Sequence, residues 1–138
     1  QIYVPNPKRG VRREAKRLGV HVSKQLLEKA CRSEWRDVRF SGAYIDSCTG
    51  SVERLLDMVR AAVPGDGDFT LCITLVGRCR ASGTMGSRLL RLTATLERDF
   101  GLWLVYPNAH GFLEFGRTVS VLYVRTPRAC APPSHLAA

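Results

Sequence analysis

The sequence predicts an α/β fold, a two-layer α+β sandwich in which two helices cover one face of a four-stranded mixed sheet. Two apolar segments with helical spacing alternate with segments in which apolar residues alternate as they do in strands. Clusters of glycine, proline and aspartate separate these segments. The 138 residues fit one domain, and their 45% hydrophobic content is ordinary for a globular protein. Together these observations predict the order β-α-β-α-β-β behind a basic helical arm.

The compact domain is expected over residues 36–128. Residues 36–40 alternate and predict a first strand, and residues 41–50 have the composition of a loop. A helix is expected over about residues 50–63, because apolar side chains recur there at helical spacing. The glycine, proline and aspartate cluster at residues 64–68 ends that helix.

The clearest strand covers residues 69–76, where large apolar side chains alternate with smaller ones. A polar loop over residues 77–83 leads to a second helix over about residues 84–100. One apolar stripe along this helix consists of Met85, Leu89, Leu92 and Leu96. Gly101 is expected to end it, because glycine often follows the last helical residue.

The last part of the domain is expected to complete the sheet. Residues 102–106 predict a third strand, and residues 112–115 and 117–124 predict a fourth strand or a hairpin arm with that strand. Right-handed crossovers place both helices on one face and make the first three strands parallel. The short turn at residues 107–111 makes the fourth strand antiparallel to the third. The prolines near the end predict a disordered tail over residues 129–138.

Residues 1–35 are expected to form a basic arm ahead of the domain. Residues 1–39 carry eleven Lys or Arg and four Asp or Glu, which accounts for +7 of the net charge of +9. A helix is expected over residues 11–18, ended by Gly19. Ser23 is expected to cap a second helix that runs to the start of the domain. The sequence leaves open whether this second helix packs on the domain or serves as a linker.

The cations of the arm form a dense stretch that suits phosphate contacts. They are Lys8, Arg9, Arg12, Arg13, Lys16 and Arg17. Arginine outnumbers lysine seventeen to four in the chain, and arginine binds phosphate in bidentate geometry and stacks on bases. A GC-rich genome would also favour arginine codons, but it would not cluster them. The charge pattern therefore indicates a polyanionic partner, with a disordered solvated tail as the alternative.

A second candidate site is the loop at residues 77–83. Arg78 and Arg80 stand between a strand end and a helix start, whose free N–H groups suit phosphate. An ordinary loop with solvated arginines would have the same composition. The residues alone therefore favour neither interpretation.

The sequence offers no cofactor site, no metal site and no catalytic arrangement. No histidine lies at catalytic spacing from a cysteine or a carboxylate. The cysteines are odd in number, match no zinc spacing and are expected to be reduced: Cys31, Cys48, Cys72, Cys79 and Cys130. We therefore expect a protein that is not an enzyme and takes no small-molecule substrate. The longest apolar run is also too short for a membrane span of about 18 residues.

Several short motifs follow one another in a characteristic order. They are Arg36-Asp37-Val38-Arg39-Phe40, Leu75-Val76-Gly77-Arg78-Cys79, Ser82 and Gly86, Gly116-Arg117, and Pro127-Arg128. In order and spacing they resemble the C-terminal domain of bacterial-type translation initiation factor 3 over about residues 36–128. The basic helix before the domain is similar to the interdomain linker of that family. The chain departs from the family at Leu75-Val76, at Cys79 and at Ser82, where the family has Phe-Arg, an acidic residue and His.

The resemblance implies a factor that binds rRNA and neighbouring proteins of the small ribosomal subunit. Such a factor prevents premature joining of the large subunit and assists selection of initiator tRNA and the start codon on mRNA. Besides the arm cations, the RNA-binding residues would be Arg36, Arg39, Arg78, Arg80, Arg88, Arg117 and Arg128. The divergence from the family and the start at Gln1 without Met favour the mitochondrial matrix, with the bacterial cytoplasm as the alternative.

Two other functions stay open at this point. A protein of the same fold could act as an assembly factor or as a permanent protein of a mitochondrial small subunit. A small α/β-sandwich hydrolase of the acylphosphatase kind would need the order β-α-β-β-α-β. The sequence shows no second strand between residues 63 and 69, which disfavours the hydrolase.

Overall fold

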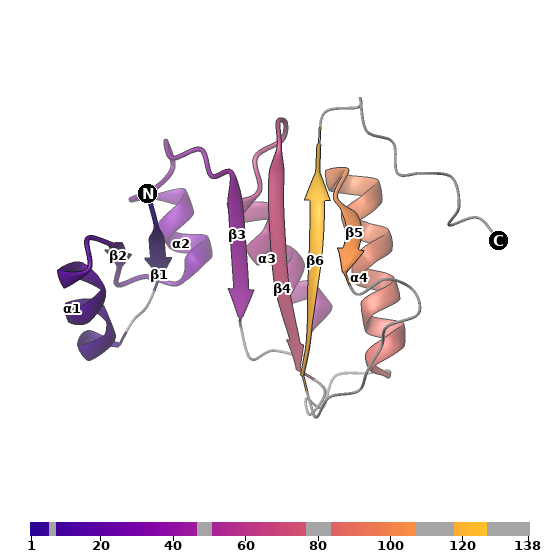
Figure 1. Ribbon diagram of the computed structural model, residues 1–138, viewed down its shortest axis with the longest axis horizontal. Helices are drawn as coiled ribbons and strands as arrows, with labels where there is room; N and C mark the ends of the chain where they lie inside the picture. Colours follow the sequence, from indigo (N-terminus) through magenta and orange to yellow (C-terminus); the bar gives the residue numbers. More distant parts are fainter. Residues whose placement is uncertain (6–7, 47–50, 77–83, 107–117, 127–138) are drawn as a thin grey trace.

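The computed structural model describes residues 1–5, 8–46, 51–76, 84–106 and 118–126. Its larger part, which we call the sheet domain, is the two-layer α+β sandwich that the sequence predicts. The four strands are, in their order along the sheet, β3 (Gly42–Asp46), β4 (Phe69–Val76), β6 (Thr118–Arg125) and β5 (Trp103–Tyr106). Helices α3 (Val52–Ala62) and α4 (Met85–Phe100) both lie on the same side of this sheet (Figure 1).

The strand directions agree with the prediction. Strands β3 and β4 pair in parallel, and β6 pairs antiparallel with both β4 and β5. Strand β6 therefore enters the sheet between β4 and β5, although it is the last strand in the chain. Because β3, β4 and β5 all run the same way, their first residues and the last residues of β6 lie at the same end of the strands (Figure 1).

The two helices begin and end where side chains and glycine satisfy their backbone groups. The Ser51 Oγ accepts the N–H of Arg54 at 3.3 Å, and the Thr84 Oγ1 accepts the N–H of Ser87 at 3.1 Å. These N-caps satisfy donors that the helix itself leaves unpaired. Gly101 ends α4 in the left-handed conformation with φ +61°, as its position in the sequence predicts.

The core lies between the sheet and the two helices. The inward side chains of β4 at Leu71, Ile73 and Leu75 are fully buried. They belong to one cluster with residues of both helices and of β6, among them Leu55, Val59, Leu89, Leu92, Leu96, Val121 and Tyr123. Each buried side chain of this size contributes about 1.5–3 kcal/mol. The predicted stripe of α4 is thus confirmed, with Met85 packed at its margin.

The first strand of the sheet corrects the sequence prediction. Residues 36–40 are not a strand, and β3 lies instead within the segment that was expected to be a loop. The N–H of Val38 donates to the carbonyl of Trp35 at 2.9 Å and closes a turn. Gly42 allows β3 to approach β4 closely, because a Cβ there would lie 3.0 Å from the carbonyl oxygen of Thr70. Pairing with β4 therefore decides the position of this strand, rather than local alternation.

The first 35 residues form a small folded unit. Strands β1 (Tyr3–Pro5) and β2 (His21–Ser23) pair in parallel, and α1 (Arg9–Arg17) connects them. The predicted basic helix is therefore present, although it begins two residues earlier than expected. Gly19 follows it with φ +73°, and its N–H donates to the carbonyl of Lys16.

The second helix of this N-terminal unit, α2 (Leu27–Arg32), is much shorter than predicted. Ser23 does not cap it, because the Ser23 Oγ accepts the N–H of Gln25 while Ser23 belongs to β2. Helix α2 packs against α3, and Ala30 and Cys31 share a buried cluster with Trp35 and Ala62. Of the two alternatives that the sequence left open, packing on the domain is therefore the one observed.

An aromatic cluster joins the N-terminal unit to the sheet domain. The ring of Tyr3 lies 5.5 Å from Trp35 and 5.4 Å from Phe40 in edge-to-face geometry. On its other side Tyr3 stacks on His21 of β2 at 4.6 Å. Such aromatic pairs add about 0.5–1.5 kcal/mol beyond the area that they bury. The cluster therefore holds β1 beside the segment that precedes β3.

Candidate nucleic-acid interface

Helix α1 presents its positive charge to solvent. Residues 8–17 contain six cationic side chains and one carboxylate, a net charge of +5. None of the helical residues is buried. Within this segment Arg17 forms an ion pair with Glu14 at 3.2 Å, and both side chains are more than half exposed. An exposed pair of this kind contributes about 0–1 kcal/mol, so it holds Arg17 only weakly.

The spacing of the cations places three of them on one side of α1. Arg9, Arg13 and Lys16 stand at positions i, i+4 and i+7, which share a face of a helix. Lys16 and Arg17 also occupy the last turn, where the helix dipole favours positive charge. A row of exposed cations on a helix binds phosphates without reading base sequence. This arrangement fits the phosphate contacts that the sequence predicts for the basic arm.

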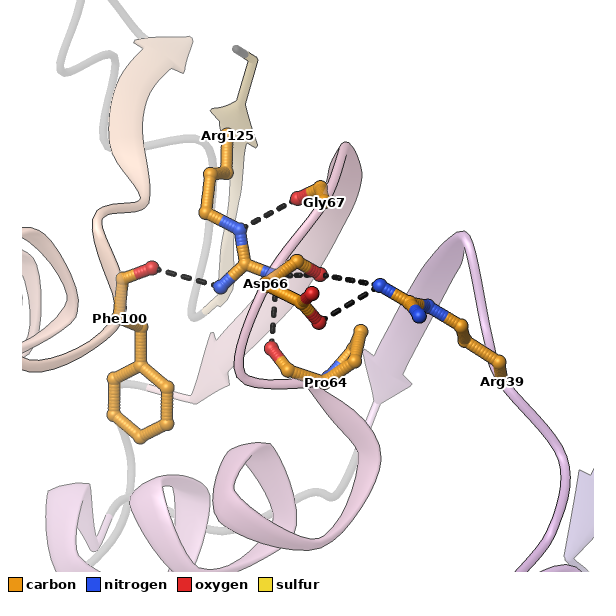
Figure 2. A network of polar contacts seen from close by, with 6 residues as sticks. All are labelled: Arg39, Pro64, Asp66, Gly67, Phe100 and Arg125. Carbon is orange, nitrogen blue, oxygen red and sulfur yellow. Dashed lines mark hydrogen bonds and ion pairs between the residues drawn. The ribbon is translucent and has the colours of Figure 1, made fainter. Parts of the chain in front are cut away.

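Arg36 and Arg39 lie in the segment between α2 and β3. Both side chains are exposed, and the Arg36 Nε donates to Asp37 at 3.3 Å. An Arg39 amino group donates to Asp66 Oδ1 at 2.7 Å (Figure 2). A cavity of about 270 Å³ beside them is lined in part by both arginines and by Trp35. The two guanidinium groups are thus within reach of a ligand, although each already has a carboxylate neighbour.

Arg125, at the end of β6, acts as a structural clamp. Its guanidinium donates to the carbonyls of Gly67 at 2.7 Å, Pro64 at 2.8 Å, Asp66 at 3.0 Å and Phe100 at 3.0 Å (Figure 2). These carbonyls belong to the turn between α3 and β4 and to the end of α4. The sequence marks Arg125 only as a cation at a strand end, and no local signal identifies its partners.

Arg88 differs from the expectation for an RNA-binding residue. Its relative exposure is only 6%, and its guanidinium donates to the carbonyl of Val76 at 3.1 Å and to that of Thr84 at 3.4 Å. It therefore ties the start of α4 to the end of β4. A buried guanidinium with backbone partners is a structural element, and we leave Arg88 out of the interface.

Three further arginines of the helices pair with carboxylates. The pairs are Arg60 with Asp57 at 2.9 Å, Arg91 with Glu53 at 2.7 Å, and Arg98 with Asp99 at 2.6 Å. The hydrogen bond from Arg98 lowers the pKa of Asp99. All three lie on α3 or α4, and each is thus locally neutralised by its carboxylate partner.

The remaining predicted residues, Arg78, Arg80, Arg117 and Arg128, lie outside the described residues. The described strand ends next to them are informative. Val76, two residues before Arg78, is the register partner of Thr118, which directly follows Arg117. The segments that contain Arg78, Arg80 and Arg117 therefore adjoin this pair of strand ends, whereas Arg128 comes after the other end of β6. Arg39 and Arg125 lie at the opposite end of the strands, where both contact Asp66 before the start of β4.

The described residues give little support for a metal site, a reactive thiol or a membrane-spanning helix. They contain no group of three or more His, Cys, Asp or Glu side chains placed to hold a metal ion. Cys31 and Cys72 are free thiols, and burial raises the pKa of both. A raised pKa disfavours the reactive thiolate. No helix in this part of the chain is long and apolar enough to cross a membrane.

Comparisons of the chain with protein-family models, with curated proteins and with solved structures found no match.

Proposed function

We propose that the protein is a non-enzymatic, RNA-binding translation initiation factor of the small ribosomal subunit, acting in the mitochondrial matrix. It would occupy the subunit through phosphate contacts, prevent premature joining of the large subunit and assist selection of initiator tRNA and the start codon. The observation that carries RNA binding is the exposed row of cations on α1, which has a net charge of +5 over residues 8–17. The ribosomal role depends on the resemblance of residues 36–128 to the initiation-factor domain.

Two further features support an RNA partner. Arg36 and Arg39 are exposed beside a small cavity at one end of the strands. At the opposite end of the strands, the paired ends of β4 and β6 adjoin the segments that contain Arg78, Arg80 and Arg117. Phosphate contacts at these places would orient the domain, while α1 would supply affinity that does not depend on sequence.

The test is co-sedimentation with small ribosomal subunits, with and without large subunits, at several salt concentrations. The variant R9Q/R13Q/K16Q removes three charges from one face of α1. At about 0.1 M salt, loss of three phosphate contacts should weaken binding about 100-fold and lower the salt slope by about 2. Bound wild-type protein should reduce the amount of large subunit that joins.

The matched control is R60Q/R91Q/R98Q, which removes the same charge from cations that already have carboxylate partners. We expect this control to bind nearly as tightly as wild type. Equal losses in the two variants, or binding that does not respond to salt, would refute the α1 interface. Stoichiometric retention in purified mature subunits would instead indicate a permanent ribosomal protein.

A further inference from the structure

A cavity of about 810 Å³ separates β1 of the N-terminal unit from β3 of the sheet domain. Its size falls within the range of about 300–1,000 Å³ that is usual for ligand sites. In Figure 1, β1 lies on the side of β3 that faces away from β4, and β3 is the outermost strand of the sheet there. Residues of both strands line it along their whole length. The cavity is therefore an elongated groove bounded by two strands, and we call it the β1–β3 groove.

The wall formed by β3 presents unpaired backbone groups. The N–H of Thr70 donates to the carbonyl of Ser41 at 3.1 Å, so the odd-numbered residues of this segment point their backbone groups toward β4. The backbone groups of Gly42, Tyr44 and Asp46 consequently point away from β4, into the groove. Within the described part of the chain, none of these groups has a hydrogen-bond partner. An open strand edge of this kind is a template for pairing with another extended chain.

The opposite wall is a weaker template. The N–H of His21 donates to the carbonyl of Ile2 at 2.9 Å, so the backbone groups of Tyr3 and Pro5 point away from β2. Pro5 has no N–H to donate. A strand added in the groove would therefore bond mainly to β3, while β1 limits its other side.

The groove is apolar inside and acidic in its charged side chains. Leu27, Trp35, Phe40 and Met58 contribute apolar surface. Its charged side chains are Glu28, Asp46 and Arg54, with a net charge of −1 in a chain of net charge +9. None of these three forms an ion pair with another described residue. A nucleic-acid strand would need a cationic lining, whereas a basic peptide complements this one.

We propose that the β1–β3 groove binds an extended basic segment of a partner protein, which adds to β3 as a further strand of the sheet. Alternate side chains of that segment enter the apolar interior, and basic side chains face Asp46 and Glu28. This inference is independent of RNA binding by α1, because it uses a different surface of opposite charge.

The probe is a fluorescent peptide of alternating valine and lysine, as long as β3, with a valine and glutamate peptide as the charge control. We expect the valine and lysine peptide to bind the full chain and to slow amide hydrogen exchange at Gly42, Tyr44 and Asp46. The amides of Ala43 and Ile45, which already point toward β4, should change little. The same peptide with methylated backbone nitrogens should not bind, because it cannot donate to β3.

Two variants locate the site. Tyr44→Pro removes one N–H that points into the groove and should weaken binding about fivefold, whereas Tyr44→Thr keeps the N–H and should bind more tightly than the proline variant. Asp46→Lys should weaken the lysine peptide and favour the glutamate peptide. Equal binding of the methylated peptide to the unaltered chain would overturn the proposal even if Tyr44→Pro failed to fold. Unchanged exchange at the three amides, or their protection by single-stranded RNA instead, would overturn it as well.

Discussion

The N-terminal unit and the sheet domain use positive charge in different ways. In α1 and the residue before it, six cations accompany a single carboxylate, Glu14. In the sheet domain, Arg60, Arg91 and Arg98 each pair with a carboxylate, and Arg125 donates to four backbone carbonyls. The same residue type therefore stabilises the fold in one region and leaves charge for a polyanion in the other. Charge reversal or neutralisation should separate the two uses, because one changes stability and the other changes binding.

The largest effect on stability is expected from Arg125→Met. The variant leaves the carbonyls of the turn and of Phe100 without their charged donor, which should lower the free energy of unfolding by about 3 kcal/mol. Urea denaturation measures this loss. Arg125→Lys should lose less, because lysine keeps the charge but not the planar fork. A fully stable Arg125→Met protein would show that the clamp does not support the fold.

The second test uses a buried group of the sheet domain. Burial raises the pKa of Tyr123 to about 12, while its hydroxyl lies 2.9 Å from Thr93. In the unfolded chain the phenol titrates near pH 10, so above that pH its ionisation favours the unfolded chain. The stability that depends on a neutral Tyr123 is therefore complete below about pH 10 and is lost as the pH rises toward about 12. The free energy of unfolding should fall by about 2 kcal/mol over this interval. Tyr123→Phe should remove this decline, and an unchanged decline in that variant would assign it to other groups.

Arg88→Met should have a smaller effect. It removes the donor to Val76 and Thr84 from a site that is almost closed to solvent, at a cost of about 1–2 kcal/mol. Binding to small subunits, measured per folded molecule, should equal that of wild type. A strong loss of binding would place Arg88 in the RNA interface. It would then contradict the assignment of this arginine to the stability of the sheet domain alone.

The smallest change in stability is expected for R9Q/R13Q/K16Q. These side chains are exposed, and α1 buries none of its residues. The free energy of unfolding should therefore stay within about 0.5 kcal/mol of wild type while RNA binding falls. Thermal and urea unfolding check the first part. A large destabilisation would mean that α1 contributes to the fold and would remove the sharpest difference between the regions.

Much of the sheet domain follows from local patterns. Strand β4 and helix α4 have the predicted bounds within one residue, because alternation along residues 69–76 and the stripe along the helix each match one periodicity. Thr84 and Gly101 mark the ends of α4 through hydrogen bonding and a left-handed φ. The basic face of α1 is also visible in the sequence, because it needs only cations at helical spacing.

Other features depend on residues that are distant in the chain. Strand β3 has five residues, two of which are Gly42 and Asp46, so its own propensity is weak and pairing with β4 decides its place. The alternation of residues 36–40 misled the prediction because Trp35 closes a turn there. Ser23 looked like a helix cap but belongs to a short parallel strand. In each case a tertiary contact outweighed a local preference.

The sequence by itself determined the order of elements in the sheet domain, the apolar faces that form the core and the basic character of α1, because each is a property of neighbouring residues. Only the tertiary structure decided that β6 lies between β4 and β5, that Arg88 is buried and that Arg125 meets four carbonyls. It also decided that an open strand edge faces β1. The physical reason is that hydrogen bonds and burial between distant segments depend on how the chain packs, which local periodicity does not encode.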